Sequence, residues 1–280
     1  LFGALISPTD PVAVLAILKR ARTPHGLEVQ ISGESLFNDG VGVVVFTAIL
    51  DVALGGHGVS AGGIALHFLR EAGGGAAFGL AVGYVAYRML YAVDNSSVEI
   101  LVTLALVTGG YWLAQQIGVS GPLAMVVAGL FIGNRGRRLA MSDNTRTHLD
   151  TFWLVVDEGL NAVLFLLIGM EVLLIDLTPP YLAAGLVAVP VVLAARFISV
   201  GAPIRLLRMR TTMVPYALRL MTWSALRGGI AIALALSLPD SQQRGLILVM
   251  TYVVVVFSLL VQAPTVEGLA RRARQAAGTG

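Results

Sequence analysis

Two short segments of this sequence place acidic, amide and hydroxyl side chains inside otherwise apolar stretches. The first is GESLFNDG at residues 33–40, which contains Glu34, Ser35, Asn38 and Asp39. On a helix, Glu34 and Asn38 lie one turn apart, and so do Ser35 and Asp39, so the segment carries two adjoining polar stripes. Two carboxylates within an apolar stretch, with no base between them, need a cation or a proton. The segment therefore predicts a cation or proton site, with a polar contact between helices as the alternative.

The second segment, ISPTDPVAV at residues 6–14, places Thr9 and Asp10 between two prolines. Because proline has no N–H, two carbonyls upstream lose their helical partners and the helix must break. At membrane depth such backbone is tolerated only where it is buried in protein or lines a wet cavity. The freed carbonyls, the Thr9 hydroxyl and a carboxylate would form an oxygen site for a small cation. For Asp10 we expect mainly a capping role on the next half-helix.

Two arginines also fall within apolar stretches. Arg227 precedes two glycines in WSALRGGIAIALAL at residues 223–236, and each glycine weakens a helix by about 1 kcal/mol. We expect a second interrupted span here, with Arg227 compensating a negative half-helix end rather than snorkelling to the surface. Arg196 needs a carboxylate partner if it is buried; Glu34 is the best candidate and Asp39 the alternative, unless Arg196 snorkels. Two interrupted spans in two halves indicate an inverted-repeat transporter.

Three further carboxylates belong to the stretch FWLVVDEGLNAVLFLLIGMEV at residues 152–172. Asp157 and Glu158 fit either a funnel that attracts cations or a contact between helices, and Glu171 lies near the end of the span. The sequence assigns no role to any of the three.

The elements that must position these residues are apolar helices. The chain has 280 residues, of which 56% are hydrophobic and 12% charged, with a mean hydropathy of +0.82; a soluble domain carries about 25% charged residues. Several stretches approach the roughly 20 residues needed to cross a bilayer, which predicts an all-α integral membrane protein. The sequence begins at Leu1, not Met, and we expect an N-terminally truncated fragment. The candidate spans are Phe2–Leu18, Val29–Leu54, Gly74–Tyr91, Val98–Ile117, Pro122–Gly133, Leu149–Leu174, Tyr181–Val200, Pro215–Leu238 and Gly245–Val261.

Charge in the loops between these spans predicts their orientation. Basic residues gather strongly on one side of the predicted membrane, and an excess of Lys and Arg marks the cytoplasmic side. The N-terminus of the fragment is therefore expected outside and its C-terminus in the cytoplasm. The net charge of +3 follows from these loops and does not indicate a nucleic-acid surface. The tail RRARQAAGTG at residues 271–280 is expected to be disordered.

Five motifs together carry a resemblance to a known family: SPTDPVAV, GESLFNDGVGVVVF, LNAVLFLLIGMEV, LAARF and WSALRGGIAIALALSLP. In this order they resemble the electroneutral branch of the monovalent cation:proton antiporters, which includes sodium/proton antiporters and sodium/hydrogen exchangers. The Asn-Asp pair is the most specific of these features. The resemblance implies an inverted-repeat antiporter fold of twelve or thirteen spans with two discontinuous helices.

The resemblance also implies roles for the residues of the two polar segments. Asp39 would bind the cation and the proton alternately, and Asn38 marks the electroneutral type. Ser35 and Thr9 would supply further cation ligands. No cofactor is implied, since Na⁺ (or K⁺ or Li⁺) and H⁺ are the transported ions.

Four charged residues take supporting roles in the same comparison. Glu34 would pair with Arg196, and Asp10 and Arg227 would lie at the two unwound crossings. Where the family has alanine before Thr-Asp, this sequence has Ser-Pro, which leaves the backbone ligands open. The implied division is first-repeat core helices at 1–54, scaffold and dimerisation helices at 55–176 with a cytoplasmic loop at 134–148, second-repeat core helices at 177–262, and a cytoplasmic tail at 263–280.

The implied function is secondary active transport, not enzymatic catalysis. A monovalent cation, Na⁺ first, would exchange electroneutrally for H⁺ by competition for Asp39, serving pH homeostasis in a bacterial inner membrane. The expected partners are these ions, membrane lipid and a second copy of the chain, without nucleic acid. The sequence leaves two alternative functions. An intramembrane aspartyl protease using Asp10 and Asp39 lacks the Tyr-Asp and Gly-x-Gly-Asp signatures, and a passive cation channel would conduct without proton coupling.

Overall fold

The computed structural model describes residues 1–11, 14–15, 17–18, 23, 25–54, 61–171, 177–207 and 216–278. These residues form helices joined by short connections and contain no strand, so the prediction of an all-α protein is confirmed. The helices are α1 (Phe2–Leu5), α3 (His25–Ala53), α4 (Ala61–Ala92), α5 (Ser96–Gln116), α6 (Gly121–Phe131), the π-helix η1 (Ile132–Gly136), α7 (Arg137–Leu139), α8 (Asp143–Glu171), α9 (Pro179–Leu207), α10 (Ala217–Trp223), α11 (Gly229–Leu236), α12 (Gln242–Phe257), the π-helix η3 (Ser258–Gln262) and α13 (Ala263–Gly278).

Five stretches of the described helices are long and apolar enough to cross a membrane, and each overlaps a predicted span. They are Gly26–Ala53, Ser96–Gln116, Asp143–Met170, Pro179–Leu206 and Gln243–Gln275. Two other predicted spans fall within α4 and within α6 followed by η1. The remaining two, Phe2–Leu18 and Pro215–Leu238, are the ones predicted to be interrupted.

Both predicted interruptions are present. α1 ends at Leu5, and the backbone of residues 7–11 is not helical. α10 ends at Trp223, and α11 begins only at Gly229. In each case the helix stops where the sequence places proline or glycine beside a charged residue.

The described chain forms two compact units, and the first comprises Leu1 and Gly40–Leu166. Within it, α4 packs against α6 through a stripe of glycines. A Cβ on Gly79 would overlap the carbonyl oxygen of Ala124, so only glycine permits this approach of two backbones. Close packing through small residues is typical of helices in lipid, where helix association depends on van der Waals contact.

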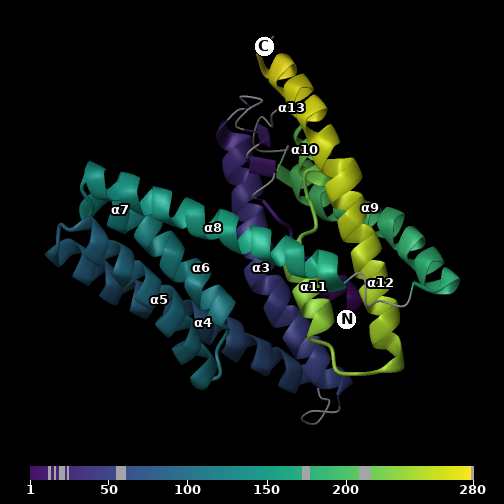
Figure 1. The fold of residues 1–280 in the computed structure, drawn as a ribbon, viewed down its shortest axis with the longest axis horizontal. Helices are drawn as coiled ribbons and strands as arrows, with labels where there is room; N and C mark the ends of the chain where they lie inside the picture. Colours follow the sequence, from purple (N-terminus) through teal and green to yellow (C-terminus); the bar gives the residue numbers. More distant parts are fainter. Residues whose placement is uncertain are drawn as a thin grey trace. The chain divides into compact units, whose positions relative to one another are not determined.

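The second unit comprises Phe2–Asp39 and Leu167–Gly280, and it contains both interruptions. Its core gathers side chains from residues far apart in the chain, including Leu27, Leu220, Leu226 and Val266, all at most 1% exposed. α12, η3 and α13 follow one another and appear in yellow as one rod (Figure 1).

The expectation of a disordered tail is wrong for the residues that the structure describes. α13 continues to Gly278, and Ala270 and Ala273 are fully buried with Val266 in the core of the second unit. These three residues recur every three to four positions, so they lie on one face of the helix. The basic residues that suggested a solvated tail occupy the remaining faces, with Arg271 paired to Glu267 at 2.6 Å.

Candidate functional site

Thr9 lies at the centre of the polar cluster that the sequence predicted. Its backbone N–H donates to Oδ1 of Asp39 at 3.0 Å, and its hydroxyl donates to Oγ of Ser35 at 3.0 Å. Nδ2 of Asn38 donates to the Thr9 hydroxyl at 3.4 Å. Thr9 and Ser35 are 1% and 5% exposed. The structure therefore brings together all four residues predicted as ion ligands, three from α3 and one from the first break.

The break is what makes this geometry available. In an uninterrupted helix the N–H of Thr9 would bond to the carbonyl four residues earlier. Here it faces the Asp39 carboxylate, which lies on α3 one turn beyond Ser35. Two hydroxyl oxygens and a carboxylate are hard oxygen ligands, which suit a small monovalent cation, and Asn38 turns its amide nitrogen toward the Thr9 hydroxyl.

Arg227 compensates the carbonyl oxygens left over in the first break. It therefore takes the role predicted for it at a half-helix end and does not snorkel to the surface. Its Nη1 donates to the carbonyl oxygen of Ser7 at 2.7 Å and to that of Pro8 at 3.1 Å, and the residue is 6% exposed. The Ala4 carbonyl accepts from the backbone N–H and the hydroxyl of Ser7. The break therefore does not leave these carbonyl oxygens without donors, and their service as cation ligands stays a prediction.

Asp10 lies against the second break. Its backbone N–H donates to the Leu226 carbonyl at 2.8 Å. A Cβ on Gly228 would lie 2.9 Å from Oδ2 of Asp10, so the carboxylate is packed on the residue that precedes α11. The N-terminus of a helix carries partial positive charge, which favours a carboxylate there. Several residues of the half-helix that Asp10 was expected to cap lie outside the described residues.

Arg196 of α9 pairs with Glu34 of α3 and not with Asp39. The two nitrogens Nη1 and Nη2 donate to the two carboxylate oxygens of Glu34, each at 2.6 Å. Nη2 also donates to the Met221 carbonyl of α10 at 3.3 Å. The Arg196 and Glu34 side chains are 10% and 26% exposed. This fork-to-fork geometry is the strongest form of an arginine–carboxylate contact, and it ties three helices of the second unit together.

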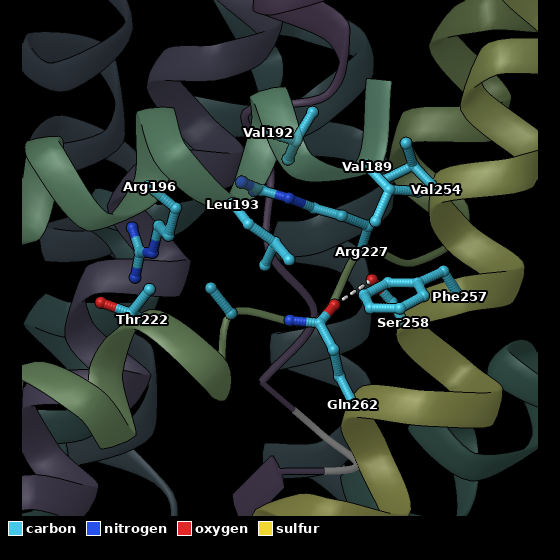
Figure 2. A pocket seen from close by; sticks show the side chains of 11 residues that line it. Val189, Val192, Leu193, Arg196, Thr222, Arg227, Val254, Phe257, Ser258 and Gln262 are labelled. Atoms are coloured by element: carbon cyan, nitrogen blue, oxygen red, sulfur yellow. Dashed lines mark hydrogen bonds between the residues drawn. The ribbon is translucent and has the colours of Figure 1, made fainter. Parts of the chain in front are cut away.

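A small pocket lies beside the two arginines (Figure 2). Its apolar lining comes from α9, α12 and Ala225 of the second break, and its polar lining from Arg196, Arg227, Thr222, Ser258 and Gln262. Sequence reasoning missed Thr222, Ser258 and Gln262. For the last two a signal existed, because they are polar residues within the apolar run VVVVFSLLVQA.

Two of the three unassigned carboxylates belong to the first unit, and the side chain of the third is not described. Asp157 and Glu158 are exposed on the part of α8 that belongs to the first unit, and Asn161 donates to Asp157 at 3.3 Å. The side chain of Glu171 is not among the described side chains.

Comparisons with known proteins agree on the family. A family model described as "Sodium/hydrogen exchanger, transmembrane" matches residues 1–272. The chain is 49% identical over 276 residues to the Na(+)/H(+) antiporter NhaP of Pseudomonas aeruginosa, covering 97% of this chain and 65% of that protein. It is 36% identical over 279 residues to the Na(+)/H(+) antiporter NhaH of Halobacillus aidingensis, covering 97% and 67%.

A solved structure has the same fold. The sodium proton antiporter MjNhaP1 from Methanocaldococcus jannaschii superposes with a TM-score of 0.77 at 22% identity, covering 96% of this chain and 69% of that one. The chain thus spans about two thirds of the length of these relatives. It is an integral membrane protein, and it belongs to the sodium/hydrogen exchanger, transmembrane, family.

Proposed function

We propose that the protein containing this chain is a secondary active antiporter, not an enzyme, that exchanges a monovalent cation for H⁺. Na⁺ is the first candidate cation, and K⁺ and Li⁺ are the alternatives. The observation that carries the proposal is the convergence of Thr9, Ser35 and Asn38 on Asp39 where a broken helix meets α3. Relatives that are 36–49% identical bear the name Na(+)/H(+) antiporter, which supports the same class of cargo.

The proposed mechanism is competition for one carboxylate. The Thr9 N–H engages Oδ1 of Asp39, and the carboxylate then holds either a proton or a cation. The hydroxyls of Thr9 and Ser35 replace water around the cation. Asn38 is neutral, so the ligand cluster contains one exchangeable negative charge. One cation then leaves as one proton enters, which makes the exchange electroneutral.

The other charged side chains near the cluster are held in contacts of their own and take no part in the exchange. Glu34 and Arg196 neutralise each other at 2.6 Å. Asp10 and Arg227 each lie against the broken helix of the other interruption. In this scheme they hold the ligands in place and keep the crossing stable as Asp39 changes its proton or cation.

The division of the chain into core and scaffold is proposed by analogy with the family. Residues 1–54 and 177–262 would form the core that provides alternating access, and residues 55–176 the scaffold through which two copies form a homodimer. The basic loops support a cytoplasmic C-terminus and an external N-terminal end of this chain. The site of action would be the bacterial inner membrane, with pH homeostasis as the role.

Proton flux in sealed membrane vesicles tests this function on the complete protein. We expect addition of Na⁺ to drive proton movement, and Asp39→Asn to abolish it, because an amide cannot bind and release a proton. Asp157→Asn, on an exposed carboxylate of the first unit, is the matched control and should retain exchange. Flux that persists in Asp39→Asn would contradict the mechanism. Current without obligatory proton coupling would indicate a channel.

A further inference from the structure

The rod formed by α12, η3 and α13 contains one π-helical turn beside the second break. η3 covers Ser258–Gln262 within the stretch Gln243–Gln275, which is apolar enough to cross a membrane. π-turns inside α-helices are rare and occur mostly at functional sites. This turn buries two polar side chains, Ser258 at 0% and Gln262 at 3% exposed. Neither residue has a role in the exchange proposed above.

The hydrogen bonds of Gln262 define which way its amide points. Nε2 donates to the carbonyl oxygen of Trp223 at 3.2 Å, and Oε1 accepts from the Ser258 hydroxyl at 2.7 Å. A backbone carbonyl can only accept, so the amide nitrogen must face Trp223 and the amide oxygen must face Ser258. Ser258 thus holds Gln262 in the orientation that donates to Trp223, and Figure 2 shows the contact between the two side chains.

Trp223 is the last residue of α10, so its carbonyl is one of those that a helix leaves without an internal partner. The same rod holds this residue in two further ways. The Trp223 indole N–H donates to the Thr265 hydroxyl at 2.8 Å, and its ring meets Phe257 edge to face with centroids 6.4 Å apart. The end of α10 is therefore fixed to the rod by three contacts, of which only the Gln262 bond reaches the backbone.

From the end of α10 a short path leads to the ligands. Three residues beyond Trp223, the Leu226 carbonyl accepts from the N–H of Asp10 at 2.8 Å. The next residue, Arg227, donates to the carbonyls of the first break at 2.7 and 3.1 Å. That break carries Thr9, whose N–H bonds to Asp39. The position of the α10 end therefore sets where the first break, and Thr9 with it, lies relative to α3.

We propose that Gln262, oriented by Ser258, is a positioning residue for the exchange reaction. It fixes the end of α10 so that Leu226 and Arg227 keep their contacts with the first break and Thr9 keeps its bond to Asp39. The inference rests on the proposed function, because it concerns the geometry of the same ligands. It assigns the π-turn a purpose, since the turn carries both the Gln262 amide that reaches α10 and the Ser258 hydroxyl that orients it.

The test uses the complete protein in sealed vesicles, with purified protein for stability. Gln262→Met keeps a similar volume and removes both hydrogen bonds. We expect the KM for Na⁺ to rise about fivefold, the size expected for loss of the one bond that reaches the Trp223 carbonyl, with a shifted pH profile of exchange and a smaller change in kcat. Ser258→Ala removes only the bond that orients the amide and should shift KM and the pH profile less.

The matched control is Thr251→Val on α12. It also removes a fully buried hydroxyl, but one that bonds at 2.7 Å to the Ile247 carbonyl of its own helix. KM and the pH profile of this variant should match the wild-type values. Wild-type KM and pH profile in both Gln262→Met and Ser258→Ala would overturn the inference, whatever their stability. An equal KM rise in the control would also overturn it. If Gln262→Met does not reach the membrane, Ser258→Ala decides.

The wild-type arm separates this inference from the proposed function. Absence of cation-driven proton flux in the wild-type protein contradicts the antiporter assignment itself, and the inference then falls with it. Normal flux in the wild type with unaltered variants contradicts only the role of Gln262 and Ser258.

Discussion

The two breaks in the second unit meet each other but are built from different residues. The first, at residues 7–11, is made by two prolines and carries Thr9, a ligand candidate. The second, at residues 224–228, contains no proline and carries Arg227. The end of α10, which precedes this break, is held by side chains of other helices, namely Gln262 and Arg196. One break thus provides the chemistry, and the other provides support.

The comparison shows that each break depends on contacts from the other. The carbonyls left over in the first break accept from Arg227 of the second. The second break in turn receives Asp10, packed on Gly228, and accepts its N–H at Leu226. Each break therefore carries the charge that the other needs. Substitutions of the residues that join the two breaks should act on stability, and substitution of the ligand candidate Thr9 should act on ion affinity.

The largest effect on the supporting side should come from Arg196→Ala. Removing one partner of a largely buried ion pair leaves Glu34 without its counter-ion, which typically costs about 3–5 kcal/mol. The variant also loses the bond from Arg196 to the Met221 carbonyl of α10. Thermal unfolding in detergent should show a strongly lowered midpoint. The double variant Glu34→Ala/Arg196→Ala should recover part of the loss. An unchanged midpoint in Arg196→Ala would contradict the role of the pair.

Arg227→Met tests the reciprocal contact between the breaks. It leaves the carbonyls of Ser7 and Pro8 without their donor. We expect a loss of about 2–3 kcal/mol in unfolding free energy. Asp10→Asn should cost less, because its backbone bond to Leu226 remains. In a double-mutant cycle the two changes should be coupled. Strict additivity would show that the breaks do not support each other.

Gly228→Ala tests the packing between the breaks. A Cβ at this position would lie 2.8 Å from Cβ of Asp10, so one of the two segments must move. Overpacking of this kind costs about 1–3 kcal/mol. The φ angle of Gly228 is −126°, which any residue adopts, so the contact alone causes the loss. Gly26→Ala is the control, because nothing lies within 4 Å of its Cβ position. Equal stability of the two variants would contradict the close approach.

Sequence reasoning located both breaks and the Glu34–Arg196 partnership for a common physical reason. A charge or a proline inside an apolar stretch is costly, so its position alone indicates that a partner or a break exists. Few carboxylates lie at a depth in the predicted membrane from which they could reach Arg196. The choice of partner was therefore limited to Glu34 or Asp39. The ligand roles of Thr9, Ser35, Asn38 and Asp39 remain predictions from the family resemblance.

The partners of backbone atoms could not be predicted in this way. The Ser7 carbonyl was expected to be free for a cation, but it accepts from a residue 220 positions away. Gln262 meets the Trp223 carbonyl through a π-turn that no sequence period indicates. α13 differs, because its buried Val266, Ala270 and Ala273 already follow a helical period. The basic residues beside them obscured that signal.

The smallest predicted effect concerns Thr9, where side chain and backbone can be separated. Thr9→Val keeps the shape of the side chain and the N–H that bonds to Asp39, but it removes the hydroxyl shared with Ser35 and Asn38. Loss of one neutral ligand should raise the KM for Na⁺ roughly fivefold, which corresponds to about 1 kcal/mol. Stability should change little. Thr9→Ser retains the hydroxyl and should keep the wild-type KM.

If Thr9→Val leaves the KM unchanged, the hydroxyl is not a cation ligand. The first break would then act only through the backbone N–H that it presents to Asp39. That outcome would make the two breaks more alike than proposed, because both would act by placing backbone atoms. A raised KM in Thr9→Val, with wild-type behaviour in Thr9→Ser, would instead keep the distinction. The ligand-bearing break would then contribute through a side chain, and the supporting break through the charges and hydrogen bonds that hold it.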